Sequence, residues 1–428
     1  MVLPARIGFT SVFIVPLILA GSLQADDWPQ WRGPNRDGQW NETGILEAFP
    51  PGGLTVRWRA PVRVGVSTPI VVRGRVYITD TELVRPKAHE RLHAFDEATG
   101  QSLWTYANDV DYPDWAYDEA SPLGPRATPI YQDGKIFTMG PFGNVCCVDA
   151  LKGETVWKKD LRAEYPGQNL ECTASPLIDG DLLIVCVGAK PGACVIAFDK
   201  KTGNKVWSAL DEQATFSSPI VIGAGGTRQL IVWTYQSVTA LDPATGKTHW
   251  RQPTSSSEEF AVSTPVIKDN LLLVGGLMLK LDSDKPAATV LWPQSRAASK
   301  RNLSNTSTAL FRGDFLYSAK SSGHLVCIEA STGKQVWETD KATELGSGAS
   351  IHLTPNGQSF LLYNDRGELI RAQLTPAGYK ETSRAPLLEP TYPFGGRKFA
   401  WSPPSYANRH IFVRNDKELI CAALGTEP

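Results

Sequence analysis

The chain of 428 residues is 42% hydrophobic and 20% charged, and it contains 13 tryptophans. This amount of apolar material excludes a disordered chain, a collagen-like chain and a small scaffold held by disulfides. With 43 Lys and Arg residues against 44 Asp and Glu residues, the net charge is −1, so no global field attracts nucleic acid or an anionic membrane. We therefore expect no nucleic-acid partner.

The first 25 residues have the pattern of a secretory signal peptide. Arg6 precedes the apolar run of residues 7–20, and a short segment ending at Ala25 leads into the polar chain. The run is shorter than the roughly 20 residues that a membrane-spanning helix needs. We expect residues 1–25 to be cleaved from a periplasmic or secreted protein without a stable membrane anchor, leaving residues 26–53 as an N-terminal extension.

One motif recurs along residues 54–428. An acidic residue is followed four positions later by Gly, and four positions after that by Trp. The five copies are Asp96-Gly100-Trp104, Asp149-Gly153-Trp157, Asp199-Gly203-Trp207, Asp242-Gly246-Trp250 and Glu329-Gly333-Trp337. Trp292 closes a sixth, degenerate copy, and Trp58 stands before the first. Successive Trp residues are 42 to 53 positions apart, close to the roughly 40–50 residues of a four-stranded propeller blade.

The segments between these Trp residues predict β-strands. Each period has a Ser, Thr or Ala before Pro, then two short runs rich in β-branched residues, as in residues 68–78, and none has helical periodicity. Two less regular units follow Trp337, and the last has no closing Trp. Residues 54–59 resemble its missing outer strand. We predict an all-β, eight-bladed β-propeller of four-stranded antiparallel blades, closed by pairing of this N-terminal strand with the C-terminal blade. Seven blades is the alternative.

The motif has a physical interpretation. The acid accepts hydrogen bonds from backbone N–H groups in a tight turn, and Gly adopts the positive φ that the turn needs. The Trp ring fills the gap between adjacent blades, while its indole N–H finds an acceptor. We therefore assign a structural role to the Trp of each blade: Trp58, Trp104, Trp157, Trp207, Trp250, Trp292 and Trp337.

These copies, with their Ser/Thr-Pro strand starts, resemble the PQQ-like (pyrroloquinoline quinone repeat) β-propeller superfamily. The sequence of residues 28–38, WPQWRGPNRDG, resembles the start of secreted bacterial PQQ-binding-like propellers. The resemblance implies one of two activities: a quinone-dependent alcohol or sugar dehydrogenase, or a non-catalytic propeller such as the periplasmic scaffold of the outer-membrane assembly machine. Fold alone does not choose between them.

The dehydrogenase alternative implies PQQ with Ca²⁺, an Asp that acts as a base and a Trp beneath the cofactor. We find no residues in this sequence that match the Ca²⁺ ligands, the Asp and the Trp of such an enzyme. The pair Cys146-Cys147 resembles the vicinal disulfide of such enzymes. However, it falls within a predicted strand, where successive side chains point to opposite faces, so we expect buried thiols. We predict no catalytic residue, no cofactor and no metal.

An acidic and aromatic loop spans residues 108–119 and includes Asp111, Asp114, Trp115 and Tyr117. Its spacing does not match an EF-hand, and the nearby pair His89 and His93 lies outside a helix, which disfavours zinc. A solvated acidic loop is the first interpretation. There are three alternatives. The loop could be a polar-aromatic surface for a partner, a Ca²⁺ site, or a carbohydrate site formed by the rings of Tyr112, Trp115 and Tyr117.

Residues just before each inner strand should surround the mouth of the axial channel, because the inner strands of a propeller face the axis. This gives six candidate ligand-binding residues: Ser67, Arg126, Glu171, Phe216, Phe260 and Asn302. The sequence thus predicts an exported monomer that acts as a non-catalytic binding or scaffold platform for a protein, a small molecule or a glycan. A PQQ-dependent dehydrogenase and a carbohydrate-binding propeller are the two alternatives.

Overall fold

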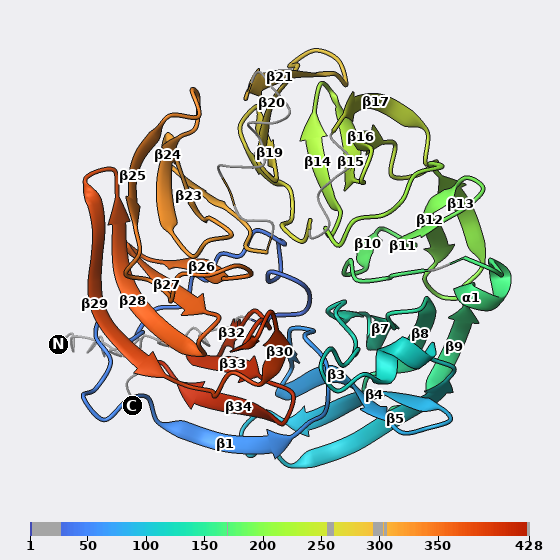
Figure 1. Ribbon diagram of the computed structural model, residues 1–428, viewed down its shortest axis with the longest axis horizontal. Helices are drawn as coiled ribbons and strands as arrows, with labels where there is room; N and C mark the ends of the chain where they lie inside the picture. Colours follow the sequence, from blue (N-terminus) through green and yellow to red (C-terminus); the bar gives the residue numbers. More distant parts are fainter. Residues whose placement is uncertain (2–26, 169, 255–260, 294–302, 304–305, 426–428) are drawn as a thin grey trace.

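The computed structural model is a ring of β-sheets around one axis (Figure 1). It describes the chain except for residues 2–26, 169, 255–260, 294–302, 304–305 and 426–428. The predicted signal peptide and the candidates Phe260 and Asn302 thus lie outside the described residues. Helical structure among the described residues is limited to the turn η1 (Asp114–Tyr117) and the short helix α1 (Leu161–Glu164), so the predicted all-β class is confirmed.

Eight four-stranded antiparallel sheets form the blades. The first four blades consist of β2 (Ile70–Val72), β3 (Arg75–Leu83), β4 (Ala88–Asp96) and β5 (Ser102–Val110); β6 (Ile130–Gln132), β7 (Lys135–Met139), β8 (Asn144–Asp149) and β9 (Thr155–Asp160); β10 (Leu177–Asp179), β11 (Leu182–Ala189), β12 (Ala193–Asp199) and β13 (Lys205–Ala209); and β14 (Ile220–Ala224), β15 (Thr227–Trp233), β16 (Ser237–Leu241) and β17 (Thr248–Pro253).

The next three blades consist of β18 (Val266–Lys268), β19 (Leu271–Val274), β20 (Leu277–Leu281) and β21 (Ala288–Trp292); β22 (Leu310–Arg312), β23 (Phe315–Ala319), β24 (Leu325–Glu329) and β25 (Gln335–Thr339); and β26 (Ile351–Asn356), β27 (Ser359–Asn364), β28 (Glu368–Thr375) and β29 (Gly378–Pro386). The last blade has β32 (Ser405–Ala407), β33 (His410–Arg414), β34 (Glu418–Ala423) and β1 (Val56–Pro61). A separate hairpin, β30 (Tyr392–Phe394) and β31 (Arg397–Phe399), precedes that last blade.

The two ends of the chain close the ring. Strand β1 pairs antiparallel with β34, placing Trp58 opposite Cys421, and becomes the outer strand of the eighth blade (Figure 1). This closure removes the exposed edges that an open sheet would present to other chains. The predicted eight blades and their closure are confirmed, and the alternative of seven blades is wrong, because the weak units after Trp337 each form a complete sheet.

In five blades the Trp of the outer strand packs against the Gly turn of the next blade. A β-carbon on Gly203, which has a φ of +71°, would lie 2.8 Å from the Trp157 ring, and the Trp157 indole donates to the Lys200 carbonyl at 3.0 Å. The same ring-to-glycine packing joins Trp58 to Gly100, Trp104 to Gly153, Trp207 to Gly246 and Trp292 to Gly333. Trp250 differs, because the following turn has no Gly, and its indole donates to Gln229 Oε1 instead.

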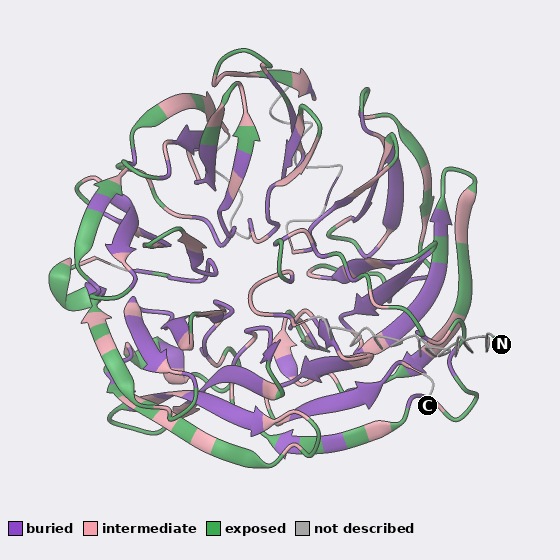
Figure 2. Cartoon of the chain, turned by 180° about the vertical axis from the view of Figure 1, so that it is seen from behind, coloured by how far each residue is buried: buried purple, intermediate pink, exposed green. Residues whose placement is uncertain are grey.

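The core is divided among the interfaces between blades (Figure 2). Cys146 and Cys147 illustrate this division, because Cys146 packs with the first blade around Ile70 and Cys147 packs with the third around Leu183. All seven cysteines are buried free thiols. Burial raises the pKa of Cys146 to about 11 and that of Cys147 to about 12.

The segment before β1 crosses the axis of the ring. Trp28 forms a bridge with Val71 in the first blade, and the Trp31 indole donates to Thr264 Oγ1 before the fifth at 2.7 Å. Arg36 donates to the Pro176 carbonyl, and the Trp40 amide donates to a carbonyl of β26. This segment therefore covers one end of the axial channel (Figure 1).

Candidate functional site

A cavity of about 240 Å³ lies on the axis. Its walls come from the connections that lead from the outer strand of one blade to the inner strand of the next, and from the N-terminal segment. The described residues that line it are Trp31, Val66, Ser121, Arg126, Thr173, Ser175, Phe216, Ser218, Val262, Thr306, Ser350, His352, Tyr392, Phe394, Trp401 and Pro403.

The lining follows a regular position in the repeat. In seven of the eight blades, the residue four positions before the first residue of the inner strand faces the cavity. These residues are Val66, Arg126, Thr173, Phe216, Val262, Thr306 and Trp401. Because equivalent positions of the blades meet at the axis, this set forms a ring whose members share a backbone position and differ in chemistry.

Two of the six candidates from the sequence line this cavity, namely Arg126 and Phe216. Ser67 is buried behind the lining, where its hydroxyl donates to the Thr79 carbonyl. Glu171 is exposed and is not among the lining residues; it precedes β10 by six positions, whereas its neighbour Thr173 occupies the facing position. Aligning the repeats on the start of each inner strand is the signal that separates Thr173 from Glu171.

Sequence reasoning missed the aromatic wall formed by the β30–β31 hairpin and the lead-in segment. Trp401 stacks on Phe399 with ring centroids 4.8 Å apart, and its indole donates to the Gly348 carbonyl at 2.9 Å. Tyr392 lies 5.2 Å from the Trp401 ring and donates from its hydroxyl to the Pro122 carbonyl. These contacts fix the rings before any ligand arrives. The hairpin with Tyr392 is an insertion outside the repeat, so the period gave no signal for it, whereas Trp401 holds the regular position four residues before β32.

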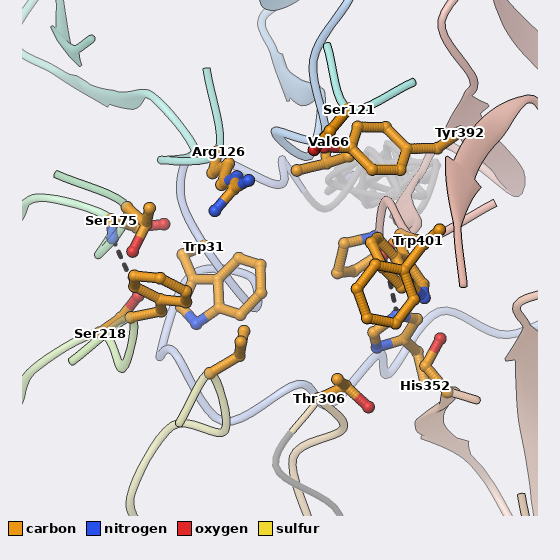
Figure 3. A pocket seen from close by; sticks show the side chains of 16 residues that line it. Trp31, Val66, Ser121, Arg126, Ser175, Ser218, Thr306, His352, Tyr392 and Trp401 are labelled. Atoms are coloured by element: carbon orange, nitrogen blue, oxygen red, sulfur yellow. Dashed lines mark hydrogen bonds between the residues drawn. The ribbon is translucent and has the colours of Figure 1, made fainter. Parts of the chain in front are cut away.

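Arg126 is the single charged side chain of the described lining at neutral pH. Its guanidinium lies 5.6 Å from the centre of the Phe216 ring. His352, on the other side of the cavity, is neutral because burial lowers its pKa to about 4, and its Nε2 donates to the Trp401 carbonyl at 3.3 Å. The described lining contains no carboxylate. Figure 3 shows Arg126 and Trp31 facing His352, Tyr392 and Trp401 across the cavity.

Two buried hydroxyls in the lining have no protein partner among the described residues. Thr173 is 8% exposed and Ser350 is 1% exposed, and neither side-chain oxygen forms a hydrogen bond there. An unsatisfied buried hydroxyl costs about 1–3 kcal/mol. Because both line the cavity, a bound molecule or water would remove this cost.

The acidic loop contacts basic residues of the connection between β3 and β4. Asp114 pairs with Arg85 at 2.5 Å and Asp111 with Lys87 at 3.7 Å, while Arg85 also lies over the Tyr117 ring. Trp115 is the exposed ring of this loop, at 51% exposure. Tyr112 is buried, so it adds nothing to a surface platform for a sugar.

Below this loop lies a buried carboxyl group. Glu90, in β4, accepts a hydrogen bond from the Tyr112 hydroxyl at 3.0 Å, and a β-carbon on Gly140 would overlap its carboxylate. Burial raises the pKa of Glu90 to about 8, despite the opposing effect of the Tyr112 and Asn144 hydrogen bonds. The Glu90 carboxyl therefore anchors Tyr112, the buried tyrosine of this loop, between the first two blades.

Across the described parts of the chain, no three His, Cys, Asp or Glu side chains gather as a metal site. The described cavity lining offers one guanidinium and no carboxylate, which does not match PQQ with Ca²⁺, because PQQ carries three carboxylates and Ca²⁺ prefers oxygen ligands. Within the described residues, the chain has no helix long and apolar enough to span a membrane.

The eight blades and their Asp-Gly-Trp turns define a PQQ-like β-propeller. Comparison with known families then gives a specific assignment. The chain belongs to the PQQ_2 family, described as outer membrane protein assembly factor BamB, whose model matches residues 54–196, 88–273 and 192–356, more than half of the chain.

Curated relatives are of two kinds. The chain is 32% identical over 153 residues to quinohemoprotein alcohol dehydrogenase ADH-IIG of Pseudomonas putida, a match covering 32% of this chain and 20% of that protein. It is 25% identical over 259 residues to outer membrane protein assembly factor BamB of Moranella endobia, covering 56% of this chain and 62% of that protein. The chain therefore spans less than two thirds of the length of either relative.

Solved structures share the fold. BamB from Moraxella catarrhalis matches with a TM-score of 0.60 and 16% identity, over 88% of this chain and 99% of that chain. Quinohemoprotein alcohol dehydrogenase from Comamonas testosteroni matches with a TM-score of 0.63 and 14% identity, over 94% of this chain and 81% of that chain. At such identities the likeness speaks for the fold alone.

Proposed function

We propose that this chain is an exported, non-catalytic binding propeller whose axial cavity holds a small ligand. The observation that carries the proposal is the composition of the described cavity lining: rings fixed by their own hydrogen bonds, one guanidinium, and two buried hydroxyls without a partner among the described residues. Pockets of this kind, mostly apolar with a few polar groups, are typical of small-molecule sites. The described lining lacks a carboxylate to act as a general base.

A PQQ-dependent dehydrogenase is the alternative, favoured by the names of the matched relatives. The two are separated by adding PQQ and Ca²⁺ to the purified protein and following reduction of an artificial dye with alcohols and aldoses. We expect no turnover above a protein-free control. Turnover that requires PQQ would overturn the non-catalytic proposal.

Carbohydrate binding is the remaining alternative, and in this structure it rests on Trp115. A glycan array probed with the natural chain and with Trp115→Ala tests it directly. Leu103→Ala, at a residue 42% exposed on the outer strand β5, is the matched control. Glycan signals lost with Trp115→Ala and kept with Leu103→Ala would establish a sugar site at the loop, whereas we expect no specific signal.

A further inference from the structure

We propose that the axial cavity binds a flat aromatic carboxylate of one or two rings, with its carboxylate on the Arg126 guanidinium and its rings beside Trp31, Phe216 and Trp401. This inference rests on the proposed function, since it names the class of ligand for the same cavity. Four features of the cavity lead to it: its size, its charge, its walls and its closed end.

The size selects the number of rings. A cavity of about 150 Å³ in a protein core holds one benzene molecule. The axial cavity, at about 240 Å³, therefore has room for one or two fused rings with a small substituent. A larger polycyclic cofactor would have to extend beyond it.

The charge selects a single anionic group. Arg126 forms no hydrogen bond or ion pair with a described residue; its contact is with the face of Phe216. Arg126 is half-buried, and its planar guanidinium matches a carboxylate through two parallel hydrogen bonds. Because His352 is neutral, one negative charge balances the described lining.

The walls select a flat molecule. Trp401 is held by the Gly348 carbonyl and the Phe399 ring, and Trp31 is held by Thr264. Rings fixed in this way offer planar surfaces at little entropic cost, and aromatic pairs gain about 0.5–1.5 kcal/mol beyond burial. The Ser350 hydroxyl supplies a hydrogen-bonding partner for a polar substituent of the ligand.

The closed end sets the orientation. Residues 28–40 cross the channel beneath the cavity, with Trp31 in its wall, so a ligand enters from the face of the blade connections. Arg126 lies in one of those connections, between β5 and β6. The carboxylate is thus expected near the entrance side of the ring of lining residues, where it keeps part of its hydration.

Isothermal titration calorimetry with 2-naphthoate and the neutral 2-naphthamide tests this proposal on the full chain. Charge-assisted hydrogen bonds contribute about 1.5–3 kcal/mol, so we expect naphthoate to bind at least about tenfold more tightly than naphthamide. Arg126→Gln should bring naphthoate to the affinity of naphthamide. The control Arg59→Gln, at an exposed arginine on β1, should keep the preference.

Three results would overturn the inference: no binding of naphthoate, equal binding of the two probes to the natural chain, or an unchanged preference in Arg126→Gln. The comparison of probes needs no variant, so it stands even where Arg126→Gln folds poorly, which thermal unfolding would reveal. PQQ-dependent turnover would instead overturn the proposed function. If neither turnover nor naphthoate binding is observed, the proposed ligand class is wrong, whereas the non-catalytic proposal stands.

Discussion

The ring of Trp58, on the outer strand of the eighth blade, lies directly against Gly100 in the turn of the first blade. A β-carbon on Gly100 would come within 2.5 Å of the Trp58 ring, and the Trp58 indole donates to the Glu97 carbonyl of the same turn at 2.7 Å. The contact joins the eighth blade to the first, and on its own strand Trp58 lies opposite Cys421 in the β1–β34 pairing where the two chain ends meet. It therefore holds against the first blade the strand that completes the eighth.

Gly100→Ala should lower the thermal stability of the protein strongly. The new methyl group meets the Trp58 ring, and the positive φ of +70° disfavours any side chain. Gly134→Ala is the matched control, because Gly134 has a φ of +76° with no atom within 4 Å of an added β-carbon. We expect about 1 kcal/mol of lost stability for Gly134→Ala and at least about 2 kcal/mol more for Gly100→Ala. Equal losses in thermal or denaturant unfolding would contradict the role of the Trp contact.

Glu90 should make the protein less stable as the pH rises. Its carboxyl has a pKa of about 8 in the folded chain, against 4.5 as the ordinary value, so between these values the folded state keeps a proton that the unfolded state has lost. The free energy of unfolding then falls from about pH 4.5 to about pH 8. Glu90→Gln keeps the acceptor for Tyr112 and removes the titration.

We expect the difference in unfolding free energy between Glu90→Gln and the natural chain to move in favour of the variant by a few kcal/mol from pH 5 to pH 9. Denaturant titrations at several pH values measure it. Glu154→Gln is the control, since that carboxylate is exposed on the protein surface. A pH-independent difference for Glu90→Gln would show that Glu90 titrates normally.

The adjacent cysteines should react as two buried thiols. Burial raises the pKa of both Cys146 and Cys147, and the thiolate is the reactive form, so the folded protein should resist alkylation near neutral pH. Protein prepared from an oxidising compartment and then unfolded should take up seven alkyl groups without a reductant, as counted by mass spectrometry. Five groups, rising to seven only after reduction, would demonstrate a disulfide.

Arg36 should anchor the segment that closes the channel. It is buried, donates to the Pro176 carbonyl at 2.8 Å, and its burial lowers its pKa to about 9. Arg36→Leu leaves this carbonyl without its donor, so we expect a loss of about 2–3 kcal/mol and faster proteolysis of the lead-in segment. Arg59→Ala, which removes a surface ion pair, should cost less than about 1 kcal/mol. Comparable protease sensitivity in both variants would argue against an anchoring role.

The repeat and, through it, the fold could be predicted from the sequence alone. The Asp-Gly-Trp spacing predicts blades because each element of the motif acts locally: the acid and Gly build one turn, and the Trp lies a fixed distance along the next strand. It also identified Arg126 and Phe216 among the residues before the inner strands, because blade geometry is the same around the ring.

Which of the remaining residues share the cavity depends on how the whole chain folds into a ring. Trp31 and Trp401 are far apart in the chain, and both line the cavity because the lead-in segment crosses the channel and the closed ring brings the segment before β32 to the axis. The choice between Glu171 and Thr173 depended on where β10 begins, which is set by pairing with β11. Local patterns specify the blade, whereas contacts across the axis depend on the closure of the whole ring.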